Sequence, residues 1–163
     1  MKIALATDHA GYELLKDLQK FLQEQGYQCE NFGPSKFDPA DDYPTFVKPA
    51  AEAVAEGKCQ RGIIMGGSGQ GEAMAANRIH GVRCAIFYGT AVARRSVDAQ
   101  GHVSHDPYEI VRLSRLHNDA NLLSLAARFL SLEEMQQAVK LWLLTPFTGE
   151  VRHQRRIKEL DEV

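Results

Sequence analysis

A glycine-rich stretch followed by one carboxylate carries the clearest chemical signal in this chain. Residues 62–78 read GIIMGGSGQGEAMAANR, so an apolar run leads into a glycine turn and then into small helix-forming residues, with Glu72 just after the last glycine. Glycines allow successive backbone N–H groups to converge on an anion, and a helix beginning near Gly71 adds the positive end of its dipole. An enzyme that forms an oxyanion or an enediolate needs such a cradle with an acid–base group beside it.

The spacing of these glycines excludes two common nucleotide-binding motifs. Gly66, Gly67, Gly69 and Gly71 do not form Gly-x-Gly-x-x-Gly, and no Lys-Ser/Thr pair follows them as it does in a Walker A loop. The pattern favours anion binding by some other ligand. A tight junction between a strand and a helix, with no ligand, is the alternative.

Two further clusters offer polar groups for a phosphorylated or hydroxylated ligand. Asp8 and His9 follow the first apolar run, where His9 suits a phosphate and Asp8 suits either a sugar hydroxyl or the N-cap of the next helix. Arg152 and Arg156 are four residues apart and share one helix face, so they suit a phosphate or simply form a solvated basic face.

The remaining histidines give weaker indications. His117 precedes a predicted strand, where an isolated histidine is often a polar surface or capping residue. His102 and His105 have no cluster of carboxylates or cysteines around them in the sequence, so no metal site is expected.

The bulk composition is that of an ordinary globular protein. The chain has 163 residues, of which 44% are apolar and 25% charged, which predicts one domain. Its 19 basic and 21 acidic residues give no bias toward nucleic acid or anionic membranes. Three scattered cysteines suit a reducing cytoplasm, and neither a membrane span nor a signal peptide is expected.

The apolar pattern predicts alternating strands and helices. Strands are expected at 2–6, 27–32, 62–65, 83–87 and 121–125, and helices at 11–25, 43–56, 131–144, from about 109, and from about 150. This alternation predicts a three-layer, Rossmann-like (flavodoxin-like) α/β fold: a parallel five-stranded sheet with helices on both faces, plus a C-terminal helix. Ligands of such sheets bind beyond the carboxyl ends of the strands, where Asp8, Glu72 and Arg128 fall.

Taken together, these segments resemble the ribose-5-phosphate isomerase B family, which includes the galactose-6-phosphate isomerase subunits. The resemblance covers almost the whole chain, in order. The matching pieces are Asp8-His9-Ala10-Gly11, Asp42-Tyr43-Pro44, Gly66 to Glu72 with Ala75-Ala76-Asn77, His117-Asn118-Asp119, Arg128, and Arg152-His153-Gln154-Arg155-Arg156.

This resemblance implies aldose–ketose isomerisation of a sugar phosphate, without metal or organic cofactor. A base removes the proton from C2 of the opened sugar, an enediolate forms, and the proton returns at C1. In many members the base is a cysteine at the position of Gly66. That cysteine is absent here, and the chain is similar to the branch that uses a glutamate at the position of Glu72. Burial of a carboxylate raises its pKa toward the working pH.

The other site residues follow from the resemblance, position by position. His117 protonates the ring oxygen, Asp8 holds the neighbouring hydroxyl, and Ser68 lies near O1 and O2. The resemblance implies substrate binding by His9, Tyr43, Gly67, Gly69, Gly71, Asn118, Arg128, Arg152 and Arg156. Homodimers or dimers of dimers, with active sites at the subunit interface, are also implied.

The expected substrate pair is ribose 5-phosphate and ribulose 5-phosphate. The alternatives are a hexose 6-phosphate (allose or galactose 6-phosphate), a non-catalytic phosphosugar-binding subunit, and a nucleotide-binding regulatory protein of the same architecture. Residues 1–163 are expected to form a single isomerase domain with an insertion at about 89–107. Because that insertion leaves the carboxyl end of a strand, it is either a solvated surface excursion or a wall of the substrate pocket.

Overall fold

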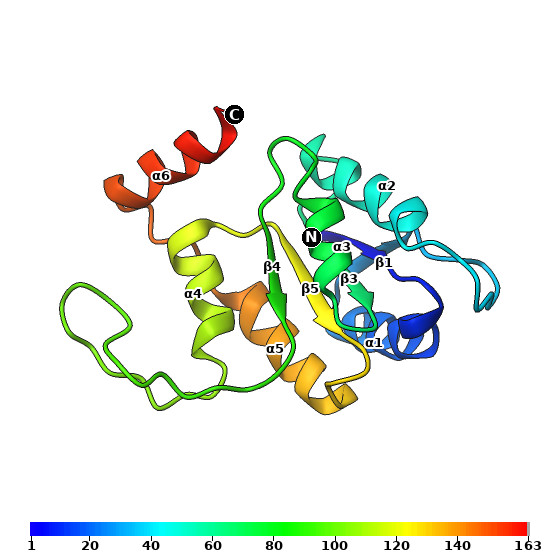
Figure 1. Ribbon diagram of the computed structural model, residues 1–163, viewed down its shortest axis with the longest axis horizontal. Coiled ribbons are helices and arrows are strands. Elements are labelled where there is room, and N and C mark those ends of the chain that lie inside the picture. Colours follow the sequence, from blue (N-terminus) through cyan, green and yellow to red (C-terminus); the bar gives the residue numbers. More distant parts are fainter. Residues whose placement is uncertain (163) are drawn as a thin grey trace.

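A computed structural model describes residues 1–162 and shows a parallel sheet between two layers of helices (Figure 1). The strand order within these residues is β2-β1-β3-β5-β4, and every neighbouring pair is parallel. The strands are β1 (Lys2–Ala6), β2 (Gln28–Asn31), β3 (Arg61–Gly66), β4 (Cys84–Phe87) and β5 (Leu122–Ala126). The predicted fold class is confirmed.

The predicted helices are also present, with boundaries that shift by one or two residues. They are α1 (Tyr12–Glu24), α2 (Pro44–Ala55), α3 (Gln70–Ala76), α4 (Glu109–Asn118), α5 (Leu132–Leu144) and α6 (Val151–Asp161), with a 3-10 turn, η1 (His9–Gly11), before α1. Ser131 and Glu134 form a reciprocal capping box at the start of α5, which satisfies backbone N–H groups that have no partner within the helix.

Two apolar cores fix the layers. On one face of the sheet, α1, α4 and α5 pack large side chains such as Leu18 and Trp142, which are fully buried. On the other face, α2 and α3 pack small ones such as Ala50 and Ala76. The small side chains let α3 lie close to the sheet, which brings its first turn beside the end of β3.

Because the strands are parallel, the connections gather at two opposite edges of the sheet. We use "carboxyl edge" for the side where β1, β3 and β5 end and "amino edge" for the side where they begin. The loops after β1, β3 and β5 lie at the carboxyl edge, whereas the end of α4, which leads into β5, lies at the amino edge (Figure 1). The fold therefore assigns each candidate residue to one edge or the other.

The connection from β4 to α4, residues 88–108, contains no helix or strand and extends away from the body of the molecule (Figure 1). Its two arms lie side by side: the N–H of Ala91 donates to the carbonyl of Pro107 (2.9 Å) and that of Val97 to the carbonyl of His102 (2.8 Å). Asp98 pairs with His102 at the tip. The segment leaves the carboxyl edge of the sheet, as expected from the sequence.

In the part of the chain that is described, none of the helices combines the length and apolar character needed to span a bilayer. Cys29, Cys59 and Cys84 are all free.

Candidate active site

The glycine loop joins β3 to α3 at the carboxyl edge. Gly69 is the N-cap of α3 and has a positive φ of 72°, a left-handed conformation that favours glycine. The hydroxyl of Ser124, on β5, donates to the Gly69 carbonyl at 2.7 Å and so ties the loop to the neighbouring strand. Glu72 consequently lies in the first turn of α3, facing back toward the end of β3.

The carboxyl group of Glu72 occupies the space beside Gly66. A Cβ atom added to Gly66 would lie 1.8 Å from Oε1 and 1.9 Å from Cδ of Glu72, far inside van der Waals contact. Any side chain at position 66 would therefore displace the carboxylate. Glu72 can occupy this position only because Gly66 has no side chain.

The surroundings of Glu72 make its carboxyl group a stronger base than an exposed glutamate. Its side chain is buried, with 4% exposure. Burial is the main cause that raises the pKa of Glu72, and the negative charge of Asp8 raises it further, while the backbone N–H of Glu72 itself acts in the opposite direction. A carboxyl group with a raised pKa is suited to accept and return a proton near neutral pH.

Asp8 and His9 lie at the end of β1, at the same edge. Asp8 is buried, and its Oδ1 accepts a hydrogen bond from the N–H of Ala10 (2.9 Å), so the expected N-cap role is confirmed. Its other oxygen, Oδ2, is 3.9 Å from Nδ1 of His9. One oxygen of Asp8 caps the η1 turn, and the charge of the same carboxylate acts on Glu72.

Asp41 holds His9 in place and was missed by the sequence reasoning. Its Oδ1 lies 3.0 Å from the backbone N of His9 and 2.8 Å from the ring Nδ1, and its side chain is 8% exposed. The loop before α2 brings it there. No spacing in the sequence relates residues 9 and 41; the acidic end of that loop was the one available signal.

Asp8, His9 and Asp41 also form a group whose possible ligand atoms lie within 4.8 Å of one another, close enough to hold a metal ion. The hydrogen bonds favour a different use. Asp41 Oδ1 already accepts from His9, and Asp8 Oδ1 caps the η1 turn. With Nδ1 donating to Asp41, the ring nitrogen left to meet a ligand is Nε2 of His9, which can donate to an anion when the ring is protonated.

Tyr43 and Arg128 complete this edge. A Cβ on Gly71 would lie 2.7 Å from the Tyr43 hydroxyl oxygen, and one on Gly67 would lie 3.3 Å from the Arg128 guanidinium. Both side chains thus rest directly on the glycine loop. Together with the loop residue Ser68 they make up the carboxyl-edge half-site, which comprises Asp8, His9, Tyr43, Gly67, Ser68, Gly69, Gly71, Glu72 and Arg128.

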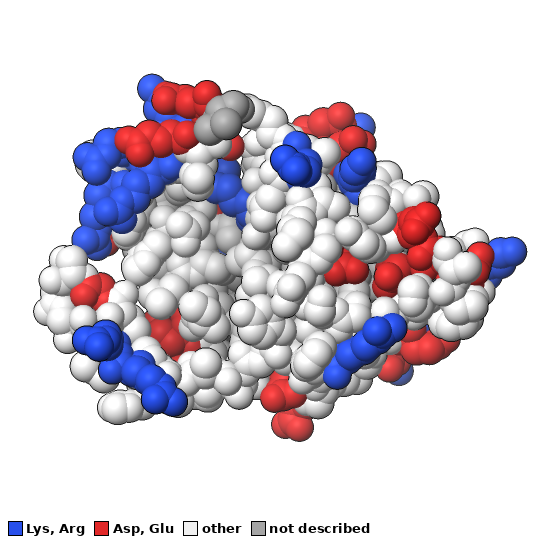
Figure 2. All heavy atoms as spheres, in the orientation of Figure 1, with Lys and Arg blue, Asp and Glu red and all other residues white. Residues whose placement is uncertain are grey.

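The other predicted residues lie elsewhere. His117 and Asn118 end α4 at the amino edge, and Arg152 and Arg156 belong to α6, which packs on α4. Figure 2 shows lysine and arginine side chains gathered over α6. We call His117, Asn118, Arg152 and Arg156 the amino-edge half-site. Within one chain, the fold does not bring the two half-sites together.

An ion pair between a buried arginine and a partly exposed aspartate fixes the end of α4. Arg115, with 2% exposure, donates from Nη1 to Asp119 Oδ1 and to the Ala120 carbonyl, both at 2.6 Å. Arg83 lies 3.4 Å from the other carboxylate oxygen of Asp119. Asp119 itself has a φ of 43°, a left-handed helix end that is uncommon for a residue other than glycine. These contacts set the direction in which His117 and Asn118 leave the helix.

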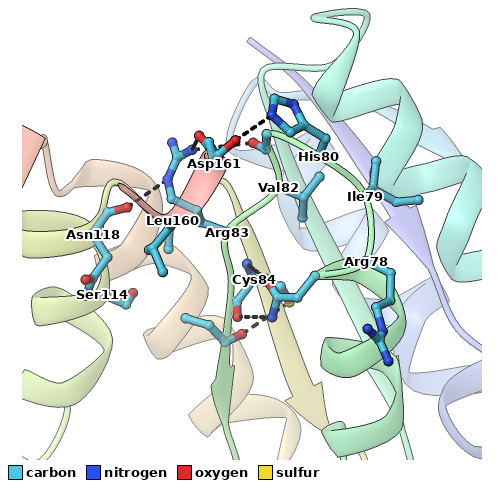
Figure 3. Close-up of a pocket in the computed structure, with 14 residues that line it drawn as sticks. Arg78, Ile79, His80, Val82, Arg83, Cys84, Ser114, Asn118, Leu160 and Asp161 are labelled. Carbon is cyan, nitrogen blue, oxygen red and sulfur yellow. Dashed lines mark hydrogen bonds and ion pairs between the residues drawn. The ribbon is translucent and has the colours of Figure 1, made fainter. Parts of the chain in front are cut away.

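A pocket of about 580 Å³ lies beside β4, the outermost strand of the sheet (Figure 3). It is bounded by the ends of α4 and α6 and by the turn after α3. Arg83 crosses it, donating to the Asn118 carbonyl at 2.9 Å and pairing with Asp161 at 3.7 Å. Its lining includes Asn118 and excludes Glu72. The pocket therefore adjoins the amino-edge half-site at Asn118 and is separate from the glycine loop.

Comparisons with known proteins all point to the same family. A family model described as "Ribose/Galactose Isomerase" matches residues 3–103 and 98–160. The two matched stretches meet within the segment between β4 and α4. The chain is 35% identical over 162 residues to "Ribose-5-phosphate isomerase B" of Mycobacterium leprae, covering 99% of this chain and 89% of that protein.

Solved structures agree. A ribose-5-phosphate isomerase B from Clostridium thermocellum has a TM-score of 0.84 and 35% identity, covering 99% of this chain and 96% of that one. The enzyme from Mycoplasma genitalium, crystallised with bound ribulose-5-phosphate, has a TM-score of 0.84 and 31% identity, covering 99% of this chain and 94% of that one.

The contact between Gly66 and Glu72 leads to a direct test. In Gly66→Ala the new methyl group must push the carboxylate out of its buried position, so we expect the pKa of Glu72 to fall toward that of an exposed glutamate. The measurement is an NMR titration of the glutamate side-chain carboxyl carbons in both proteins.

Gly89→Ala is the matched control, because a Cβ on Gly89 meets no atom within 4 Å. It should leave the Glu72 titration unchanged. A raised Glu72 pKa that survives in Gly66→Ala would contradict this account of the loop.

Proposed function

The chain belongs to the ribose/galactose isomerase family, and we propose that it interconverts ribose 5-phosphate and ribulose 5-phosphate with Glu72 as the base. The observation that carries the assignment of the base is the position of the Glu72 carboxylate in the space beside Gly66. Many family members have a cysteine base at position 66. In this chain a carboxylate with a raised pKa takes the place of that side chain.

The reaction proceeds through an enediolate. Glu72 takes the proton from C2 of the open-chain aldose and becomes a carboxylic acid, and the backbone N–H groups of the glycine loop stabilise the charge that develops on the substrate oxygens. Glu72 then returns the proton to C1, while the hydroxyl proton passes from O2 to O1 beside Ser68. The carbon skeleton stays intact, and C1 is reduced while C2 is oxidised within the same molecule, so no external oxidant or reductant is needed. We propose that no metal or organic cofactor takes part.

The phosphate and the sugar hydroxyls account for the other residues. His9, fixed by Asp41 through Nδ1, and Arg128, lying on Gly67, bind the phosphate together with Arg152 and Arg156. His117 protonates the ring oxygen to open the sugar, and Asp8 holds the hydroxyl next to that oxygen. Asn118 binds the end of the substrate where the enediolate forms. Tyr43 closes the pocket against Gly71.

This set of residues requires two subunits. Because the two half-sites lie at opposite edges of one sheet, we propose a homodimer, or a dimer of dimers, in which each active site combines the carboxyl edge of one chain with the amino edge of its partner. β4 is the outermost strand and has an unpaired side, and this side together with the adjoining pocket offers a surface that the partner can cover. Three free cysteines support a cytoplasmic location.

Two alternative functions differ from the pentose isomerase in what they require of the structure. A hexose 6-phosphate (allose or galactose 6-phosphate) is the second candidate, favoured by the segment 88–108, which leaves the carboxyl edge and so can wall the pocket. A non-catalytic phosphosugar-binding subunit has no need for a buried base, and the burial of Glu72 argues against it. We propose no binding of nucleic acid or membranes.

Replacing the base separates chemistry from folding. In Glu72→Gln we expect isomerase activity on ribose 5-phosphate to fall about 10²-fold or more, because the amide cannot accept the C2 proton. Burial raises the pKa of Glu72, so the charged carboxylate destabilises the fold increasingly as the pH rises through that pKa. The variant should therefore melt at or above the wild-type temperature at pH 8, an advantage that shrinks toward pH 4.

Glu52→Gln, on the exposed surface of α2, is the control and should keep full activity. A Glu72→Gln enzyme that turns over at the wild-type rate would rule out Glu72 as the base. Absence of activity in the wild-type protein on both pentose and hexose phosphates would rule out the isomerase function itself.

A shared active site predicts complementation between two inactive variants. If Glu72→Gln and His117→Asn chains are co-expressed, a mixed dimer has one site with both residues intact and one with neither. With random pairing, about a quarter of wild-type activity should return. Either variant alone should stay inactive, and no recovery in a mixture shown by mass spectrometry to contain mixed dimers would contradict the shared site.

The segment between β4 and α4 can be shortened to test its effect on substrate choice. Its arms are hydrogen-bonded at both ends, so replacing residues 95–103 with two glycines removes the tip and leaves Ser104 and Asp106 with their partners on α4. If the segment walls the pocket, the ratio of kcat/KM for ribose 5-phosphate and allose 6-phosphate should change several-fold. An unchanged ratio would make it a surface excursion.

A further inference from the structure

His153 is a buried titratable group to which the proposed reaction gives no role. It lies on α6 between Arg152 and Arg156, and although α6 is otherwise largely exposed and charged, the His153 side chain is only 4% exposed. Its ring lies against that of His117, with 4.5 Å between centroids and 41° between planes. The imidazole of the proposed acid is thus in direct contact with a second imidazole.

Thr148 fixes how the His153 ring is protonated. The Thr148 hydroxyl oxygen lies 2.8 Å from the carbonyl oxygen of Leu116 and 3.1 Å from Nδ1 of His153. A carbonyl only accepts, so the Thr148 hydroxyl donates its single hydrogen to Leu116, and the Thr148 oxygen must then accept a hydrogen bond from Nδ1–H of His153. His153 therefore carries its hydrogen on Nδ1, and its Nε2 is left with a lone pair.

The same contacts join α6 to the end of α4. The backbone N–H of Thr148 also donates to the Leu116 carbonyl, at 3.2 Å. This carbonyl is in the last turn of α4, where helix carbonyls lack partners within the helix, and it belongs to the residue before His117. Thr148 and His153 thus hold the backbone and the ring of His117 at adjacent points.

Electrostatics make His153 the neutral member of the pair. Burial is the main cause that lowers its pKa, and the neighbouring charges of His117, Arg152 and Arg156 lower it further, with Glu150 acting in the opposite direction. Two imidazolium rings in contact would repel each other. A neutral His153 therefore places no second positive charge against the ring of His117.

We propose that His153, held by Thr148, is a positioning residue that orients the His117 ring through their contact. The proposal rests on the proposed function of His117 as the acid that opens the sugar ring. His153 touches no reacting atom in this scheme; it acts through His117.

Two substitutions separate the ring of His153 from its hydrogen bond. His153→Phe keeps a flat ring against His117 and loses the donor to Thr148, whereas His153→Asn keeps an N–H donor and loses the ring. If the ring contact orients His117, the Asn variant should lose about tenfold in kcat with less than a twofold change in KM, and the Phe variant should stay within about threefold of wild type.

Thr148→Val is the third variant, because it removes the hydroxyl with almost no change in volume. It frees the His153 ring to turn, and kcat should fall to a value between those of the Phe and Asn variants. All three variants should still fold to the wild-type dimer mass, although the lost hydrogen bond or ring contact lowers the melting temperature. The proposal would be overturned if His153→Asn kept the wild-type kcat. It would also be overturned if the three variants raised KM and left kcat unchanged.

A spectroscopic measurement tests the same contact without turnover. In ¹⁵N NMR of the wild-type protein at pH 8, His153 should show a protonated Nδ1 and an unprotonated Nε2, and it should take up its second proton at a lower pH than an exposed histidine does. A neutral His153 with its proton on Nε2 would overturn the proposal. Lack of turnover in the wild-type enzyme would contradict the proposed function, and this measurement would still decide the state of His153.

Discussion

The arrangement of the site depends on a single steric fact, which is that position 66 has no side chain. The carboxylate of Glu72 fills the space where a Cβ would be, and this contact holds it close to the end of β3 and away from water. The left-handed Gly69 and its hydrogen bond to Ser124 set the start of α3, so that Glu72 faces that space. The fold thus buries an ionisable group at a cost in stability, and the raised pKa of Glu72 is the measure of that cost.

A second constraint comes from the parallel sheet. Parallel strands place every loop that follows a strand at one edge and every segment that precedes a strand at the other. Asp8, Glu72 and Arg128 therefore gather at the carboxyl edge, while His117 and the α6 arginines cannot join them within the same chain. The base and the proposed acid are separated by the length of the sheet. The proposed sharing of each site between two subunits would require no rearrangement of this fold.

The two half-sites are supported in different ways. At the carboxyl edge, the glycine loop lies in close contact with Tyr43 and Arg128, and Asp41 secures His9 through two hydrogen bonds. At the amino edge, the buried guanidinium of Arg115 pairs with the partly exposed carboxylate of Asp119 and fixes the end of α4. Removing Asp119 would leave the buried charge of Arg115 uncompensated. Each half-site is thus held within its own chain, so in the proposed dimer the partner would need only to dock.

Local signals in the sequence were enough to determine the layers of the fold and to single out Asp8, His9, Glu72 and the glycine loop. Strand periodicity, the Ser131 cap and the glycine spacing act over a few residues, and the elements they predicted are all present. The resemblance to a family added Tyr43, Ser68 and Asn118 and the role of His117, without placing these residues in space. The tertiary structure alone decided that Glu72 fills the space beside Gly66, that Asp41 holds His9, and that His153 lies against His117. Those contacts join residues that are six, 32 and 36 positions apart in the sequence. They depend on how the helices pack on the sheet, and side-chain packing of this kind leaves no periodic trace in the sequence.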